Sequence, residues 1–145
     1  MAGGERRQDS VRAGLDAMAE FDGVVLVHDA ARPLVSDAVV ERLVGPLRNG
    51  FDGAVPALAV ADTLKRVEDG VVAETVPREG LVRAQTPQAF LAPSLRKAFA
   101  GQIAGATDCA SLVEQSGGRV AVVEGDPRLL KITTQADLAL VESWL

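Results

Sequence analysis

The hydrophobic positions of this chain alternate between short Val-rich runs and stretches with the spacing of an amphipathic helix. The apolar runs at 24–27, 53–60 and 119–123 predict strands, and residues 129–132 predict one more. Helices are predicted from Asp9 or Ser10, from Ser36, over 93–100, over 108–115, and from Thr134 to near Trp144. This alternation is typical of an α/β fold with a parallel sheet.

Three of these elements carry more specific expectations. The first helix has Val11, Leu15 and Met18 at helical spacing, which predicts one buried face. The run 24–27 is apolar throughout and is expected to be buried on both faces of the sheet. Pro46 should bend or end the second helix, because its ring clashes with the preceding turn.

A different pattern interrupts the α/β alternation after Asp62. Two β-prone runs, 63–67 and 71–76, flank an Asp-Gly pair at positions 69 and 70. Asp-Gly between such runs is a strong hairpin signal, because both turn residues adopt positive φ angles in the favoured tight turn. We therefore expect a protruding β-hairpin arm over 62–77.

Composition and charge narrow the classes of function. The 145 residues suffice for one domain with a hydrophobic core. A net charge of −5 argues against nucleic acid as a partner, so an anionic ligand must meet a local cluster of Arg and Lys. No apolar run approaches the ~20 residues that cross a bilayer, and the start lacks a signal-peptide core, which favours a cytoplasmic protein without membrane contact. The single Cys109 is expected to be structural.

Candidate chemistry lies where the predicted strands end. Ligands of open parallel sheets bind outside the carboxyl ends of the strands, and His28, Asp29, Arg32 and Lys131 fall at such ends. Asp29 can accept hydrogen bonds from sugar hydroxyls or lie beside a magnesium ion, and Arg32 can clamp a phosphate. The alternative is that Asp29 caps a turn and Arg32 is a solvated surface charge. His28 is interpreted as a structural or orienting imidazole rather than a general base.

Four further polar residues suit a phosphate pocket. Thr63 and Lys65 lie on the predicted hairpin, Arg78 directly follows it, and Thr86 precedes a proline. Each of them taken alone is more often an ordinary surface residue. A hydrolase triad has little support, because the chain has one His and no G-x-S-x-G motif.

Seven short motifs, in a fixed order, resemble those of one enzyme family. They are G-G-x-x-R-x-x-S-V at 3–11, V-H-D-A-A-R-P at 27–33, D-T-hydrophobic-K at 62–65, R-x-G-L at 78–81, T-P-Q at 86–88, T-D-x-A-S at 107–111 and K-hydrophobic-T at 131–133. The motifs span almost the whole chain, which is thereby similar to the 2-C-methyl-D-erythritol 4-phosphate cytidylyltransferase family. Cys109 stands where this family usually has an acidic residue, and Glu5 where many relatives have Asp.

The resemblance implies a Rossmann-like nucleotidyltransferase sheet and the transfer of a cytidylyl group from CTP to 2-C-methyl-D-erythritol 4-phosphate, with release of pyrophosphate. It implies Mg²⁺ or another divalent cation, bound mainly through the CTP phosphates with Asp29 as a possible neighbour. It also implies a homodimer, in which the hairpin arm completes the partner's site. The roles that it implies are as follows: Arg78 and Lys131 hold the substrate phosphate, Arg32, Thr63 and Thr86 line the same pocket, Asp29 contacts sugar hydroxyls, and Gly4, Glu5, Ser10 and Ala30 lie near the nucleotide.

Two family motifs do not occur in the sequence. The P-A-A-G-x-G-x-R opening and the following P-K-Q segment, which bind the CTP triphosphate in the family, are absent from residues 1–145. We therefore expect a sheet that is incomplete at its N-terminal side, an unpaired edge at 24–27, and a chain that alone has little or no activity.

Two alternatives to this function stay open. The related ribitol-5-phosphate cytidylyltransferases share much of the H-D-x-x-R-P region around Asp29. The pair Ala30-Ala31 and the segment Asp62-Thr63-Leu64-Lys65 favour methylerythritol phosphate. The second alternative is a non-catalytic remnant that keeps the arm and binds a phosphate or a partner without turnover.

Overall fold

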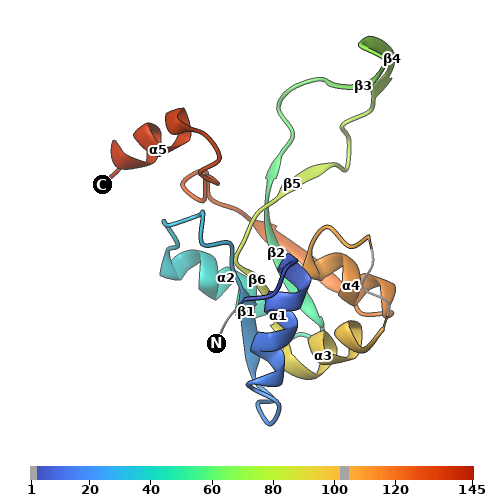
Figure 1. Ribbon diagram of the computed structural model, residues 1–145, viewed down its shortest axis with the longest axis vertical. Helices are drawn as coiled ribbons and strands as arrows, with labels where there is room; N and C mark the ends of the chain where they lie inside the picture. Colours follow the sequence, from blue (N-terminus) through green and yellow to red (C-terminus); the bar gives the residue numbers. More distant parts are fainter. Residues whose placement is uncertain (1–2, 102–104) are drawn as a thin grey trace.

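The computed structural model describes residues 3–101 and 105–145 and has a mixed sheet flanked by helices, with a separate hairpin that projects from it (Figure 1). The helices are α1 (Arg7–Asp16), α2 (Asp37–Leu47), α3 (Ala92–Ala100), α4 (Cys109–Gln115) and α5 (Gln135–Glu142). The strands are β1 (Val24–Val27), β2 (Gly53–Ala59), β3 (Leu64–Glu68), β4 (Val71–Val76), β5 (Val82–Ala84), β6 (Gln88–Leu91) and β7 (Val120–Glu124).

The central strand of the main sheet is β2. It pairs with β7 in parallel along one edge, while β5 and β6 follow each other along its other edge, both antiparallel to it. β1 pairs with β6 in antiparallel fashion and therefore runs in the same direction as β2 and β7. The α/β class is confirmed, and the sheet is mixed rather than all-parallel because β6 is inserted between β1 and β2.

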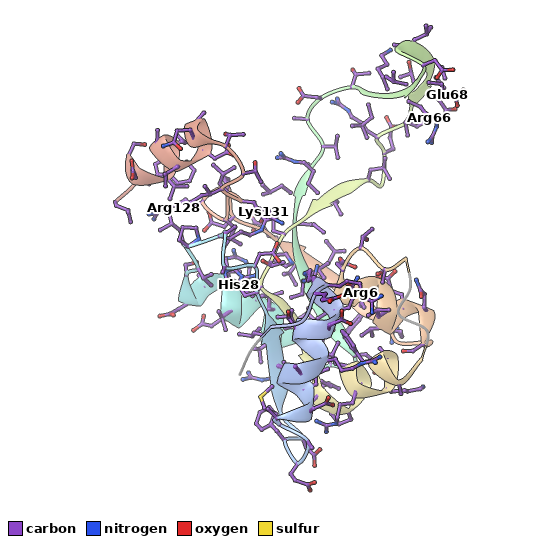
Figure 2. The ribbon with its side chains drawn as sticks, in the orientation of Figure 1. Arg6, His28, Arg66, Glu68, Arg128 and Lys131 are labelled. Atoms are coloured by element: carbon purple, nitrogen blue, oxygen red, sulfur yellow. The ribbon has the colours of Figure 1, made fainter. Side chains whose placement is uncertain are left out.

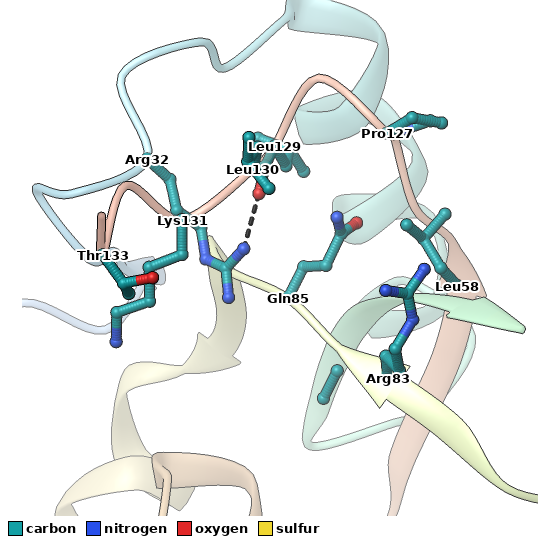
Figure 3. A pocket seen from close by; sticks show the side chains of 10 residues that line it. Arg32, Leu58, Arg83, Gln85, Pro127, Leu129, Leu130, Lys131 and Thr133 are labelled. Atoms are coloured by element: carbon teal, nitrogen blue, oxygen red, sulfur yellow. Dashed lines mark hydrogen bonds between the residues drawn. The ribbon is translucent and has the colours of Figure 1, made fainter. Parts of the chain in front are cut away.

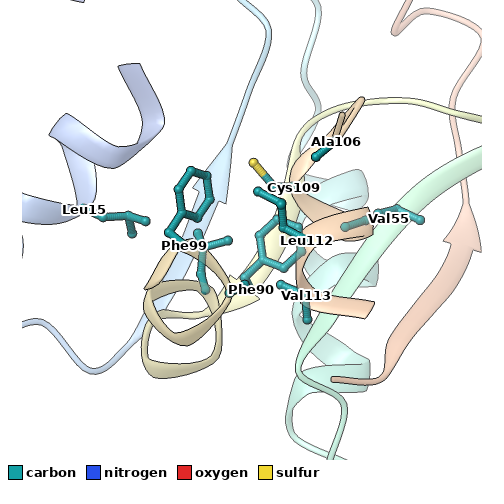
Figure 4. Packing of buried hydrophobic residues seen from close by; sticks show 11 residues of the cluster. Leu15, Val55, Phe90, Phe99, Ala106, Cys109, Leu112 and Val113 are labelled. Carbon is teal, nitrogen blue, oxygen red and sulfur yellow. The ribbon is translucent and has the colours of Figure 1, made fainter. Parts of the chain in front are cut away.

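Alternate residues of the sheet point into two separate cores. On one face, Val55 and Phe90 pack with residues of α1, α3 and α4 in the cluster of Figure 4. On the other face, Ala54 and Ala89 pack with α2 and with Leu129. The helices thus cover both faces, as expected for residues that alternate along a strand.

Several helix boundaries agree with the sequence pattern. Ser36 is the N-cap of α2, Asp108 of α4 and Thr134 of α5, each accepting a hydrogen bond from a backbone N–H in the first turn. The start of α1 differs, since Arg6 and not Asp9 or Ser10 is its N-cap. Asp9 instead accepts the Arg6 backbone N–H from inside the first turn, at 3.1 Å. α2 continues one residue past Pro46 and then ends.

The segment 129–132 does not form the predicted strand. It runs without a ladder partner, although the Ile132 N–H donates to the Ala31 carbonyl at 2.9 Å. Leu129 explains the apolar pattern, because it is fully buried against α2 as part of the second core. The segment therefore has the apolar composition of a strand but forms no strand, and it packs over the turn that follows β1.

The hairpin arm is confirmed as a two-stranded sheet of β3 and β4. Asp69 and Gly70 both have positive φ angles, 49° and 79°, as the tight Asp-Gly turn requires. Cross-strand polar pairs hold the two strands, and Arg66 contacts Glu74 at 2.6 Å. Its apolar side chains are not covered, since Val67 and Val71 are 57% and 69% exposed.

Two burial predictions are wrong at the edge of the fold. Met18 is 40% exposed because α1 ends at Asp16, so Met18 does not share the helical face of Leu15. Leu26 is 41% exposed, so β1 is not buried on both faces. Within the described residues, β1 has a ladder partner on one side only, as expected. None of the helices in those residues has both the length and the apolar character of a membrane span.

Leu15 and Met18 form a matched pair for testing the first core. Leu15→Ala should lower the free energy of unfolding by about 2–5 kcal/mol, because Leu15 is 3% exposed and its removal leaves a cavity. Met18→Ala should change it by less than about 0.5 kcal/mol. Urea unfolding followed by circular dichroism measures both, and equal losses would contradict the described end of α1.

Candidate functional site

Asp29 lies at the centre of a cluster of positive side chains just after β1. Its carboxylate is 3.2 Å from the Lys131 ammonium, 3.5 Å from the Arg7 guanidinium and 4.0 Å from Nε of Arg32. These three cations come from α1, from the turn after β1 and from the segment before α5, where Lys131 is labelled in Figure 2. One carboxylate faces three cations, so the cluster carries a surplus of positive charge.

A chain of hydrogen bonds fixes the backbone that carries Asp29. The Asp29 N–H donates to the Thr86 hydroxyl at 3.0 Å, and this hydroxyl is 3.0 Å from Nδ1 of His28. Nε2 of His28 lies 2.8 Å from the Arg32 carbonyl. Because a carbonyl only accepts, Nε2 carries a proton and donates it to the Arg32 carbonyl. His28 therefore links the turn after β1 to Thr86.

The charges around Asp29 change its titration. Partial burial alone would raise the pKa of Asp29, but the hydrogen bond and charge of Lys131, together with Arg7 and Arg32, lower it below the usual value. The carboxylate is thus held ionised. Burial lowers the pKa of Arg32, whose Nε has no hydrogen-bond partner among the described residues.

Arg7 also contacts Cys109, with its guanidinium 3.5 Å from Sγ. Burial raises the pKa of the Cys109 thiol, so this partner is neutral and does not cancel the charge of Arg7. Cys109 is fully buried in the first core, as a structural cysteine should be. Arg7 therefore adds to the positive surplus, although the sequence reasoning assigned no role to it.

A cavity of about 360 Å³ opens beside the cluster, and Arg32 and Lys131 belong to both (Figure 3). Its other walls come from the end of β2, from β5, from Gln85 and from residues 127–133. Arg32 donates to the Leu129 carbonyl, the bond drawn in Figure 3, and this ties the segment before α5 to the turn after β1. The cavity is thus continuous with the charged cluster.

The predicted nucleotide-binding residues lie around the start of α1 and the turn after β1. The Ser10 hydroxyl accepts the Gly4 backbone N–H at 2.9 Å, which holds the glycine loop against the first turn of the helix. Glu5 and Ala30 are exposed. Arg7 links this region to the cluster through its contact with Asp29.

Two residues that were predicted to bind the substrate, Thr63 and Arg78, do not join the Asp29 cluster of the same chain. Thr63 is exposed at the base of the arm, and Arg78 follows the arm and donates to the Ala61 carbonyl. In the described ranges, no hydrogen bond or ion pair connects either residue to Asp29 or Lys131. The structure therefore brings together Asp29, Arg32, Thr86 and Lys131 and leaves the two arm residues apart.

Comparison with known proteins identifies the family of the chain. The model of the family "2-C-methyl-D-erythritol 4-phosphate cytidylyltransferase" matches residues 1–145. The chain belongs to this family. A cytidylyltransferase of this name from Nocardia farcinica is 51% identical over 146 residues, which cover 100% of this chain and 63% of the relative. The bifunctional enzyme IspD/IspF of Granulibacter bethesdensis is 51% identical over 141 residues, 97% of this chain and 37% of the relative.

Solved structures of cytidylyltransferases have the same fold. The crystal structure from Thermus thermophilus superposes with a TM-score of 0.88 at 41% identity and covers 99% of this chain and 71% of the other. The one from Francisella tularensis gives a TM-score of 0.90 at 35% identity, with 99% and 70% covered. The Rossmann-like nucleotidyltransferase fold is thereby confirmed. The chain spans between 37% and 63% of the two sequence relatives named above.

Removal of the Lys131 ammonium tests the electrostatics of the cluster. Lys131→Met should raise the pKa of Asp29, because the hydrogen bond and charge that lower it are lost. The ionised Asp29 stabilises the folded protein above pH ~3.9, and this contribution is lost as the pH falls through the lowered pKa. The free energy of unfolding of Lys131→Met should therefore fall less than that of the parent protein when the pH is lowered through this range. Carboxyl NMR titration measures the midpoint. Lys65→Met on the arm is the control, and an unchanged midpoint in Lys131→Met would contradict the described ion pair.

Proposed function

We propose that this chain provides the polyol-phosphate side and part of the nucleotide side of a CTP:2-C-methyl-D-erythritol 4-phosphate cytidylyltransferase site. The observation that carries the proposal is the Asp29 cluster, which has three cations around one carboxylate in a member of this family. A surplus of fixed positive charge at the carboxyl end of a strand suits anionic substrates. The product would be 4-diphosphocytidyl-2-C-methyl-D-erythritol, with pyrophosphate released.

The chemistry requires positioning and charge stabilisation more than proton transfer. A phosphate oxygen of the polyol phosphate attacks the α-phosphorus of CTP, the new P–O bond forms, and the bond to pyrophosphate breaks. The nucleophile is already anionic near neutral pH, so no general base is needed. Lys131 and Arg32 would hold the crowded phosphate oxygens, and the Thr86 hydroxyl would line the pocket. His28, which is bonded to Thr86, fits an orienting role better than a basic one.

A divalent cation, Mg²⁺ in the first instance, would supply further neutralisation of the CTP phosphates. In the described part of the chain, no three His, Cys, Asp or Glu side chains gather as metal ligands. Asp29 is the acidic residue at the site, and it faces three cations. It therefore suits a place beside a nucleotide-bound ion better than that of a resident metal ligand.

The hairpin arm would serve a homodimer. Its valines are uncovered, with Val67, Val71 and Val72 all more than half exposed, and it projects from the main sheet (Figure 1). Arg78 and Thr63 lie at its base and do not reach Lys131 through any described contact of the same chain. Both observations support an arm that crosses to a partner subunit and brings these residues to its site. A cytoplasmic location stays a prediction.

Two alternatives are separated from the proposal by one assay. The relatives named above are methylerythritol enzymes or IspD/IspF enzymes, which favours methylerythritol phosphate over ribitol phosphate. Pyrophosphate release from CTP should be measured with both polyol phosphates. The protein should be tested as residues 1–145 and as a chimera with the part of the Nocardia farcinica relative that lies outside the match. We expect turnover of methylerythritol phosphate by the chimera and little by residues 1–145.

Faster turnover of ribitol phosphate would overturn the substrate assignment. A folded chimera that binds CTP but turns over neither substrate would support the non-catalytic alternative. The active chimera is also the background in which site variants can be measured.

A mixing experiment tests the division of the site between subunits. In the active chimera, Arg78→Ala and Lys131→Ala should each cut the turnover number by about 100-fold or more with the fold intact. If Arg78 serves the partner's site, a mixed dimer has one site with both residues intact. Mixing equal amounts of the two variants should then restore about a quarter of the original activity, as expected for random reassortment in a twofold-symmetric dimer. Initial rates before and after subunit exchange measure this.

The control for the mixing experiment combines Lys131→Ala with Arg32→Ala. Both residues belong to the Asp29 cluster of one chain, so they serve the same site from the same subunit. Each site of a mixed dimer then lacks one of the two cations, and mixing this pair should restore nothing. Failure of Arg78→Ala and Lys131→Ala to complement each other would contradict the crossing arm.

A further inference from the structure

The cavity beside Asp29 has an unusual charge for this protein. Arg32, Arg83 and Lys131 line it, and no Asp or Glu is among its lining residues. The whole chain, in contrast, has 20 acidic and 15 basic residues. The cavity is thus a local positive region in an acidic protein, which favours an anionic ligand.

Arg83 differs from the other two cations because its guanidinium has no ion pair or hydrogen bond within the described residues. Lys131 and Arg32 approach Asp29, and Arg32 also donates to the Leu129 carbonyl. The Arg83 side chain has no hydrogen bond or ion pair within residues 3–101 and 105–145. It comes from β5, opposite Leu58 of β2, and Figure 3 places its guanidinium across the cavity from Lys131.

The uncharged polar side chains of the cavity are occupied by structural bonds. Gln85 donates its amide to the Asp126 carbonyl at 2.9 Å and accepts the Asp126 N–H at 3.0 Å. The Thr133 hydroxyl donates to Asp137 at 2.8 Å. These bonds use the polar groups of both side chains and leave recognition of a ligand to the cations.

We propose that Arg83 binds the phosphate monoester of the polyol phosphate substrate, from the side of the cavity opposite Lys131. The inference rests on the proposed function and adds a phosphate-binding residue to it. A phosphate monoester is a dianion near neutral pH, whereas the charge of Lys131 is partly cancelled by Asp29. Arg83 supplies a further cation beside Arg32 and Lys131, and its planar fork can bind two phosphate oxygens. The cavity volume of about 360 Å³ is within the range of small-molecule sites.

Direct binding to residues 1–145 tests the inference without turnover. Calorimetry or NMR titration with 2-C-methyl-D-erythritol 4-phosphate should show binding, and Arg83→Met should weaken it by about 10-fold or more, as for a lost charge-assisted hydrogen bond. Arg83→Lys should recover part of this loss because it keeps the charge. The matched control is Arg48→Met, since Arg48 is an exposed arginine at the C-terminal end of α2, outside this cavity.

The ligand series identifies the group that Arg83 recognises. 2-C-Methyl-D-erythritol without its phosphate should bind equally weakly to the parent protein and to Arg83→Met. Unchanged affinity for the phosphate ester in Arg83→Met, or no binding of it to the parent protein, would overturn the inference. Arg83-dependent binding in a protein whose chimera lacks turnover would contradict the proposed function alone. Turnover with an unchanged KM for the polyol phosphate in Arg83→Met would contradict the inference alone.

Discussion

The site depends on one shared carboxylate. Asp29 is the acidic group that allows Arg7, Arg32 and Lys131 to lie within 4.0 Å of one carboxylate, and without it three like charges would repel one another. Two of these cations, Arg7 and Lys131, come from segments near opposite ends of the sequence. The same carboxylate neutralises only part of their charge. Folding therefore leaves a positive surplus at a fixed place, which suits the anionic substrates of the proposed function.

The position of Asp29 depends in turn on bonds between the turn after β1 and its neighbours. Thr86 and His28 fix the turn on the side of the sheet, and the Ile132 N–H and the Arg32 guanidinium bind it to the segment before α5. Thr86 occupies the junction of β5 and β6, so the antiparallel insertion in the sheet is what places its hydroxyl against the Asp29 N–H. The topology that departs from a parallel sheet is therefore also the topology that builds the site.

Local signals explain which parts of the fold could be predicted. The caps of α2, α4 and α5 and the Asp69-Gly70 turn depend on neighbouring residues and agree with the pattern. β5 has only three residues, all exposed, and β6 runs directly into α3 with no turn residue between them, so neither has a sequence signal. Segment 129–132 was predicted wrongly for the opposite reason. Its apolar composition reflects burial of Leu129 in a core and not pairing in a ladder.

The same distinction applies to the site. Asp29, Arg32 and Lys131 lie in motifs at predicted strand ends, and the fold brings them together. Arg7 is the arginine of the motif at 3–11, but its contacts with Asp29 and Cys109 depend on tertiary packing. The cavity position of Arg83 depends on tertiary packing too, and Arg83 has no local pattern that reveals it. Arg78 and Thr63 lie in motifs as well, but one chain leaves them apart from Lys131.

The arm gives a physical reason for that separation. A two-stranded hairpin with uncovered valines has too little buried apolar surface to hold its own position in water. In the proposed dimer, a partner's surface would cover these valines and order the arm at the same time. The two arm residues would then reach a site only when the partner is present. In that dimer, burial of the valines would drive assembly and would also position the Arg78 guanidinium. The phosphate pocket would therefore be completed when the two subunits associate.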